Sequence, residues 1–599
     1  MITKIALENF KGIGKATSIR LAPLTLLFGA NSAGKSTVLH ALAYARDIFE
    51  RHNCDATKTM LGGDSLDLGG FMEIVHGHNE NGIIRMKFDF SFTQRRLMKA
   101  NRLNYIPERG WVKIEIGIPK AHKKFQDICG YPCVLFTQVG IDEKPLVELE
   151  YCFNDAVKKG HQVRVRRLNI DHPAIEDERE AYESLFPFHE QLAFREGESD
   201  EDKLSNNDPN LDTFDYHYLR GTHALPEVSR FRPNLLLNGY QLKRQGGYQP
   251  TPGTLNMLIS RSVTELLSLL TNTVYVGPIR QIPERNFVLE RITSNPHAEK
   301  SQRDVARWAN GLGAYDVLPN LAKNWGQIND DLSKEGDEYL ETGYELVYIP
   351  DDCEIKTDGK LPVTKKSHAT VAIFGIEFWT DGKIVSQKAN YFPPEFIKYV
   401  KELSPEQLEQ FKRIFPRGEW FGLFDIKRKV LVQMHNVGVG LSQIIPLVVC
   451  MAKNRGQALM FEQPELHLHP KQQAAVGDLL IRAAMTHKTQ IIAETHSIHL
   501  IQRILRRIRE HHANSQTALF DFKPERDLCV MLAQWSEDTG TQFRQMKVRP
   551  DGKFQRSWPD SFFDQELYEK MEGQRGESET FKKTDEAIKV RLQALMETE

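Results

Sequence analysis

The residues with the clearest chemistry are Gly29-Ala30-Asn31-Ser32-Ala33-Gly34-Lys35-Ser36-Thr37. They match the pattern G-x-x-x-x-G-K-[ST] without a gap, after an apolar run at residues 24–28 and before an expected helix at residues 38–42. This is the strand–loop–helix context of a phosphate-binding loop, whose backbone N–H groups point at phosphate oxygens. Lys35 can reach the terminal phosphates, and Ser36 can hold a magnesium ion. We therefore predict that residues 31–37 bind a nucleoside triphosphate.

A second set of chemically active residues lies in the last third of the chain. His435-Asn436-Val437-Gly438-Val439-Gly440-Leu441-Ser442-Gln443 is a glycine-rich loop that runs into an apolar helix, which is a second candidate anion site. The expected strand at residues 458–461 ends in Glu462-Gln463-Pro464-Glu465, where P-loop proteins keep the carboxylate on the magnesium side. Leu466-His467-Leu468-His469-Pro470 follows, and Glu494-Thr495-His496-Ser497 comes after the expected strand at residues 490–493.

The elements that position these residues predict an α/β fold with a P-loop core. Period-2 alternation at residues 86–92 and 112–118 predicts half-buried antiparallel strands, and hence a β-layer beside the nucleotide core. A strict α/β rhythm returns after residue 433. We divide the chain into an N-terminal ATPase lobe (1–170), an irregular insertion (171–270), a central mixed region (271–433), a C-terminal ATPase lobe (434–515) and a small C-terminal α+β segment (516–599).

Composition narrows the class of protein. The 599 residues are 40 % hydrophobic and 26 % charged, with a net charge of −2, which excludes a globally basic DNA-coating protein. Seven scattered cysteines do not suggest a disulfide framework, and no apolar stretch is long enough to cross a bilayer. We expect a cytoplasmic protein with reduced thiols and no membrane partner.

Taken together, these motifs resemble those of the ABC-type ATPases, in the RecF/SMC/OLD branch. Residues 29–37 resemble Walker A, 437–443 the ABC signature, 458–462 Walker B, 466–470 the D-loop, and His496 the switch histidine. The opening segment, residues 8–12, is similar to the N-F-K segment of this branch. Residues 275–280 and 558–564 resemble predicted ATPases of prokaryotic anti-phage defence systems, of the Septu, retron-associated or PARIS type.

The resemblance implies that two copies of the chain complete one ATP site. Glu462 and Ser36 would then hold Mg²⁺, and His496 would sense the γ-phosphate. Gly440, Ser442 and Gln443 of the signature would contribute to nucleotide binding, with Gly440 and Ser442 facing the nucleotide of the second copy. Because the chain has one copy of each motif, we expect a homodimer or a higher oligomer with ATP at the interface.

The chain departs from the family pattern at the catalytic position. The family's usual catalytic glutamate directly follows the Walker B acid, and here that position is Gln463. An amide is a weak proton acceptor, and general-base help is worth roughly 10²–10⁴-fold in rate, so we expect slow turnover. Glu465 either supplies the missing carboxylate or only stabilises the turn, and the sequence leaves both interpretations open.

Several interpretations of the function stay open. In the first, ATP gates a separately encoded effector, such as a nuclease, in anti-phage defence. In the second, ATP assembles a scaffold and turnover is incidental. The alternatives are a stand-alone DNA-repair ATPase of the RecF type, for which the basic segments 164–167 and 503–507 are candidate DNA contacts, and a self-contained nuclease. The nuclease would need an HNH-like site made from Asp215, His217, His223 and Asn234.

Overall fold

The computed structural model describes most of the two expected ATPase lobes and parts of the chain between them. The described residues are 1–51, 54, 68–79, 81–92, 107–119, 132–153, 161–169, 171–178, 241–244, 247–250, 253–284, 302–321, 323–349, 353–354, 363–366, 369–372, 376–380, 383–387, 392–414 and 420–556.

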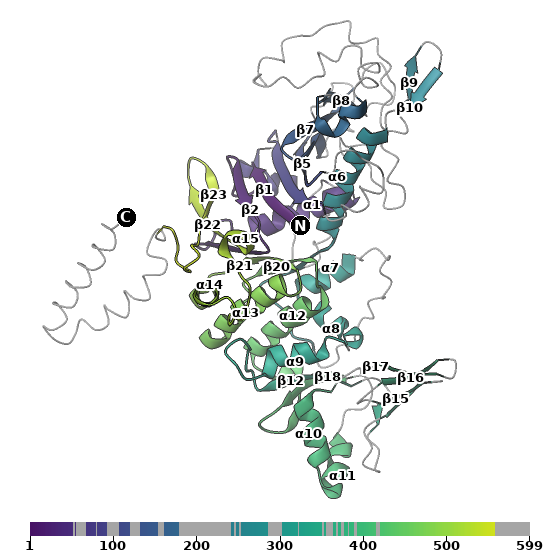
Figure 1. Ribbon diagram of the computed structural model, residues 1–599, viewed down its shortest axis with the longest axis vertical. Coiled ribbons are helices and arrows are strands. Elements are labelled where there is room, and N and C mark those ends of the chain that lie inside the picture. Colours follow the sequence, from purple (N-terminus) through teal and green to yellow (C-terminus); the bar gives the residue numbers. More distant parts are fainter. Residues whose placement is uncertain are drawn as a thin grey trace, which may run out of the picture.

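A six-stranded sheet, in the order β11-β20-β21-β3-β22-β23, forms the centre of the molecule (Figure 1). Five of its strands are parallel, and β23 pairs antiparallel with β22. The residues of β3 and β21 are buried throughout, as expected for strands covered on both faces. The strands are β3 (Leu24–Gly29), β11 (Thr273–Val276), β20 (Ala458–Glu462), β21 (Gln490–Glu494), β22 (Leu528–Ser536) and β23 (Gly540–Gln545).

Alternate residues of the central strands enter two different hydrophobic cores. In β3, Leu24, Leu26 and Phe28 join one core, whereas Leu27 joins the other, because successive side chains of a strand point to opposite faces. The first core is formed mainly with α1 (Thr37–Arg51), which directly follows the phosphate-binding loop, and with α6 (Gly253–Thr271). The second is formed mainly with α8 (Gly313–Asp316), α9 (Trp325–Ser333), α12 (Val439–Lys453), α13 (Pro470–Met485) and α14 (Ile498–Ala513).

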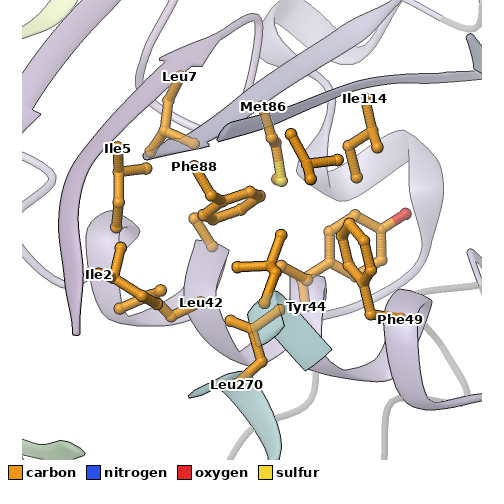
Figure 2. Packing of buried hydrophobic residues seen from close by; sticks show 14 of the residues in the cluster. Ile2, Ile5, Leu7, Leu42, Tyr44, Phe49, Met86, Phe88, Ile114 and Leu270 are labelled. Atoms are coloured by element: carbon orange, nitrogen blue, oxygen red, sulfur yellow. The ribbon is translucent and has the colours of Figure 1, made fainter. Parts of the chain in front are cut away.

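A seven-stranded antiparallel sheet forms the predicted β-layer. In β4 buried and half-buried residues alternate along the whole strand, which is the pattern that predicted it. Its buried side chains pack on α1 and α6, with Phe88 and Met86 above Leu42 and Leu270 (Figure 2). The strands, ordered β2-β1-β4-β5-β6-β7-β8, are β1 (Ile2–Glu8), β2 (Thr17–Arg20), β4 (Ile84–Ser91), β5 (Arg109–Gly117), β6 (Cys133–Ile141), β7 (Lys144–Phe153) and β8 (His161–Leu168).

A third, smaller core lies at the far end of the molecule from the β-layer (Figure 1). Aromatic side chains dominate it, with Phe396 packed against Phe392 and Phe424. It is built from β12 (Tyr344–Ile349), β18 (Trp420–Asp425), β19 (Val430–Gln433), α10 (Pro394–Glu402) and α11 (Pro405–Ile414). The remaining elements are α2 (Phe71–Ile74), α7 (Gln302–Ala309), α15 (Pro524–Asp527), β9 (Gln241–Arg244), β10 (Gly247–Pro250), β13 (Cys353–Glu354), β14 (Val363–Lys366), β15 (Ala369–Ala372), β16 (Ile376–Thr380) and β17 (Lys383–Gln387).

The predicted α/β fold with a P-loop core and an antiparallel β-layer is confirmed. None of the helices among the described residues is long and apolar enough to span a membrane. Residues 528–545, which we assigned to the C-terminal segment, extend the central sheet as β22 and β23. The end of this segment, residues 557–599, lies outside the described residues, and with it the expected terminal helix at about 577–596 and the segment 558–564.

The hairpin formed by β22 and β23 braces the phosphate-binding loop. Thr541 Oγ1 donates a hydrogen bond to Ala33 O (3.0 Å), and Thr541 N donates to Gly12 O (2.6 Å). A Cβ on Gly34 would lie 2.6 Å from Thr541 Oγ1, and Gly34 also has a φ of +87°, so both space and backbone conformation require glycine there.

We predict that Thr541→Val destabilises the protein by about 1–3 kcal/mol, because the buried carbonyl of Ala33 loses its donor. Thr539→Val on the same hairpin is the matched control, since its hydroxyl bonds Ser536 at an exposed position. Urea unfolding of both variants checks this. Equal midpoints for the two would contradict the bracing role.

Candidate nucleotide-binding site

The phosphate-binding loop connects the end of β3 to the start of α1, as predicted. Asn31 and Ser32 are exposed, and Ser32 has a left-handed φ of 61°. Lys35 is buried, and its Nζ donates to Ala30 O at 2.8 Å, so the lysine folds back over its own loop. Thr37 is the first residue of α1, which places the N-terminus of a 15-residue helix at the loop.

Glu494 is the carboxylate closest to the functional side chains of this loop. Ser36 Oγ donates to Glu494 Oε2 at 2.6 Å, and Lys35 Nζ lies 3.7 Å from Glu494 Oε1. We had not included Glu494 among the site residues. The reason is the strand order: β21, which ends at Glu494, lies between β3 and β20, so its end is nearer the loop than Glu462 is.

Glu462 ends β20, as predicted, and belongs to the same charged cluster. Its Oε1 accepts a hydrogen bond from Tyr275 OH (2.8 Å) and lies 3.6 Å from His40 Nε2. Glu462 is paired with Glu494 on the neighbouring strand, Glu494 lies 3.7 Å from Lys35, and the charge of Glu462 also acts on Lys35, so the two remote segments of the chain meet at one site.

A lysine from the opening segment joins this cluster through His40. Lys11 Nζ lies 2.8 Å from His40 Nδ1. Burial lowers the pKa of His40, with the charge of Lys11 acting in the same direction, and burial lowers the pKa of Lys11 to about 8. A neutral His40 that accepts from Lys11 at Nδ1 and carries its proton on Nε2, toward Glu462, satisfies all three groups.

Glu465 and His496 lie together beside the cluster. Glu465 Oε1 accepts the backbone N–H of His496 at 2.8 Å. Glu465 is buried, burial raises its pKa, and its Oε2 has no hydrogen-bond partner among the described residues. The pKa of the half-buried His496 is lowered by burial and by the charge of Lys35. The preceding residue, Thr495, donates its backbone N–H to Leu27 O of β3 at 3.1 Å, so His496 directly follows the pairing of β21 with β3.

Arg280 connects the Walker B turn to α12. Its Nη2 donates to the backbone oxygens of Glu462 (2.8 Å) and Gln463 (3.2 Å). Its main chain exchanges two hydrogen bonds with the side chain of Gln443, at 3.1 and 2.6 Å. Burial lowers the pKa of Arg280 to about 10, against the opposing effect of Glu465 and Glu462. Gln443, which we expected at the nucleotide, is instead buried against Arg280.

The signature loop differs from the expectation that Gly440 and Ser442 face a second copy. Ser442 is fully buried, and its hydroxyl donates to Val439 O at 2.7 Å. A Cβ on Gly440 would lie 2.7 Å from His467 O, so this glycine packs on the D-loop of its own chain. The helix α12 begins at Val439, inside the glycine-rich segment 435–443. It places Ser442 on a buried face, whereas Val439 is 51 % exposed.

Gln463 occupies a constrained turn after β20. It has a left-handed φ of 45°, which is uncommon for a residue other than glycine. Its backbone N–H donates to Glu494 O at 2.8 Å, and its own carbonyl accepts from Arg280. The backbone of Gln463 is therefore held on both sides. Asp215, His217, His223 and Asn234, the alternative nuclease residues, lie outside the described residues.

Two segments that contribute most of the site residues match a model of a known protein family. Residues 1–101 and 322–501 match the family model described as AAA ATPase domain. The phosphate-binding loop, Glu462, Gln463, Glu465, Glu494 and His496 all fall within these ranges, whereas Tyr275, Arg280 and Thr541 fall outside them. The matched segments are therefore similar to an AAA ATPase domain in two parts that are separated in the sequence, and this similarity supports ATP binding and ATPase activity.

Solved structures with a detectable likeness include three SMC head domains. The head domain bound to the C-winged helix domain of ScpA is 9 % identical, with a TM-score of 0.35, over 92 % of this chain and 98 % of that chain. The Pyrococcus furiosus head domain bound to the C-terminal domain of ScpA is 10 % identical (TM-score 0.33; 91 % and 96 % covered). The Thermotoga maritima head domain is 9 % identical (TM-score 0.31; 91 % and 99 % covered). Comparison with curated proteins gives no significant match.

The lowered pKa of Lys11 predicts a specific pH dependence of stability. The pKa of Lys11 is about 8 in the folded protein and has its usual value of 10.5 in the unfolded chain. Between these two pH values the unfolded chain therefore binds more protons than the folded protein does. The free energy of unfolding contributed by Lys11 therefore rises with pH across this window. We predict that Lys11→Met gains less stability than the wild type between pH 8 and pH 10.5, measured by urea unfolding. The exposed Lys15→Met is the control, and a Lys11→Met profile parallel to that of the wild type would contradict the prediction.

Proposed function

We propose that this protein binds ATP with Mg²⁺, hydrolyses it slowly, and uses its nucleotide state to gate a separately encoded effector in anti-phage defence. The observation that carries the nucleotide part is the meeting of Lys35 and Ser36 with Glu494 and Glu462 at one edge of the sheet. Strand ends of an α/β sheet are where such ligands bind. The match to the AAA ATPase domain supports the same activity.

The residues at this edge fit a magnesium ion. Ser36 supplies a hydroxyl, Glu462 and Glu494 supply carboxylates, and Glu465 has one buried oxygen without a partner among the described residues. The described residues contain no cluster of three or more His, Cys, Asp or Glu side chains suited to hold a metal by themselves. That agrees with magnesium, which protein sites usually hold through one or two side chains together with the substrate's phosphates. When bound, Mg²⁺ would neutralise charge on the phosphates.

For the chain's own residues we propose the following roles. Lys35 and the N-terminus of α1 bind the phosphates, and His496 senses the terminal phosphate from beside Glu465. Gln463 orients water but is a poor base, so the carboxylate of Glu465 is the remaining candidate to accept its proton. The raised pKa of Glu465 is consistent with a group tuned toward proton transfer.

We propose that two copies meet across the ATP sites. Support comes from exposed apolar side chains beside the signature: Val439 begins α12, and Ile279, which is 78 % exposed, precedes Arg280, whose N–H bonds Gln443 on the same helix. Since Ser442 is buried, the N-terminus of α12 at Gly438 and Val439 is the part that would contact the second copy's nucleotide.

The proposed defence role rests on the resemblance of residues 275–280 to defence ATPases, and these residues contribute Tyr275 and Arg280 to the site. Direct DNA binding is the second candidate function. However, the arginines of one candidate DNA-binding segment, residues 503–507, are paired with carboxylates. Arg503 and Arg507 pair with Asp478, and Arg506 pairs with Asp337 and Glu510. A scaffold with incidental turnover remains the alternative to a switch. Turnover measured with and without DNA or the effector separates these proposals.

The nucleotide proposal is tested with Lys35→Met in the full chain. We predict that the wild type binds ATP with Mg²⁺ and forms a dimer or a larger oligomer in solution. Lys35→Met should lose at least about tenfold in ATP affinity and should not form this oligomer, because a buried phosphate-binding charge is removed. Lys453→Met, an exposed lysine at the other end of α12, is the control. Calorimetry and light scattering give the two readouts. A wild type that stays monomeric with saturating ATP would refute the dimer.

The catalytic proposal is tested by exchanging Gln463. We predict that Gln463→Glu hydrolyses ATP faster, by up to roughly 10²-fold, because a carboxylate replaces an amide at the base position. Glu465→Gln, which keeps the size of the side chain, should slow the wild-type reaction if Glu465 is the base. An unchanged rate in Gln463→Glu beside a large loss in Glu465→Gln would move the role of base to Glu465 alone.

A further inference from the structure

One large aromatic side chain, Trp535, is exposed next to the phosphate-binding loop. Trp535 is 60 % exposed, although the rest of β22 is largely buried. A single exposed apolar residue needs no explanation in general. Its position relative to the nucleotide site makes this one informative.

The register of the central sheet places Trp535 at the edge where the loop begins. β22 runs parallel to β3, with Ala533 beside Gly29, the last residue of β3. Trp535 is two residues further along β22 and therefore extends past the end of β3, level with the start of the loop.

The side of the hairpin that carries Trp535 is the side that contacts the loop. Trp535 pairs directly with Thr541 on β23, and directly opposed residues point to the same face. Thr541 Oγ1 donates to Ala33 O on that face. Ala533, two residues before Trp535 and so on the same face, would contact a Cβ on Gly29 through its own Cβ at 3.2 Å. Both neighbours of Trp535 thus touch the phosphate-binding loop.

The hairpin that presents the indole is fixed rather than free. Thr541 N donates to Gly12 O, and Lys15 N donates to Thr539 O at 3.0 Å. Phe543 N donates to Thr17 Oγ1 at 3.1 Å, so β23 is also attached to the first strand pair of the β-layer. Figure 1 shows the hairpin standing beside β1 and β2. An aromatic surface on a fixed support needs little ordering when a ligand binds.

We propose that Trp535 is the surface on which the base of the bound nucleotide stacks. This rests on the proposed function, since it requires the triphosphate to occupy the loop at residues 31–37. In such a nucleotide the ribose separates the base from the phosphates, so the base lies beside the loop rather than in it, and Trp535 is an exposed aromatic side chain beside the loop. Stacking uses the face of the base rather than its hydrogen-bonding edge, so ATP and GTP should bind with similar affinity.

The test compares ATP with inorganic tripolyphosphate, which has the phosphates but no base. In the full chain, Trp535→Ala should bind ATP about tenfold more weakly and tripolyphosphate as the wild type does. Trp535→Phe should recover most of the ATP affinity, because it restores an aromatic face. ATP should also quench the intrinsic fluorescence of the wild type more than that of Trp535→Phe. Leu519→Ala, an exposed apolar residue on the segment before β22, is the control.

The possible results separate the stacking proposal from the nucleotide proposal. Equal ATP affinity in Trp535→Ala and the wild type would overturn stacking while leaving ATP binding intact. Loss of ATP and tripolyphosphate binding together in Trp535→Ala would also overturn it, because the indole would then support the loop itself. If Trp535→Ala prevents assembly at unchanged ATP affinity, the side chain is a contact between copies and stacking is refuted. A wild type that binds neither ligand would refute both proposals.

Discussion

The site depends on one contact between two remote segments, the hydrogen bond from Ser36 to Glu494 with Lys35 close by. The parallel pairing of β21 with β3 makes this contact, because it brings residue 494 beside residue 27. Everything else at the site is arranged around it: β20 on the far side of β21 adds Glu462, and the turns after both strands add Glu465 and His496. Without the pairing of β3 with β21, neither Glu494 nor Glu462 would be placed beside the phosphate-binding loop.

This arrangement keeps the ionised groups in an unfavourable environment. Burial is the main cause of the raised pKa values of Glu494 and Glu465 and of the lowered pKa values of Lys35, His40 and Arg280. Acids and bases are thus both shifted toward their neutral forms, because burial disfavours the charged form of each. A triphosphate would favour the charged forms of Lys35 and Lys11, and a divalent cation would favour those of the glutamates. Binding both together would relieve the unfavourable burial of each set.

The sequence predicted the parts of this site that are contiguous in the chain. The phosphate-binding loop follows from its spacing alone, and Glu462 follows from its place at the end of an apolar strand. Glu494 could not be ranked above Glu462, because that depends on which strand lies next to β3, and periodicity does not reveal strand order. Ser442 was misplaced because the direction of a helical side chain depends on the residue at which the helix begins, and helix ends are the least certain feature of a sequence. The segment 275–280 stood out only by its resemblance to defence ATPases, which did not reveal that Arg280 belongs to the site, and Thr541 gave no local signal. The roles of both residues come from tertiary contacts.

Arg280 gives a physical reason why a movement of α12 should affect the turn that contains Gln463. Its main chain is bonded to Gln443 of α12, and its guanidinium to the carbonyls of Glu462 and Gln463. The backbone of Gln463 is also held in a left-handed conformation. A small shift of α12 would therefore be passed on to this turn rather than absorbed by the contacts between them. A second copy that presses on Val439 at the start of α12 would therefore act on the position of Gln463 through one buried side chain. For the proposed assembly of two copies, such a link would let assembly adjust turnover without any direct contact between the partner and the attacking water.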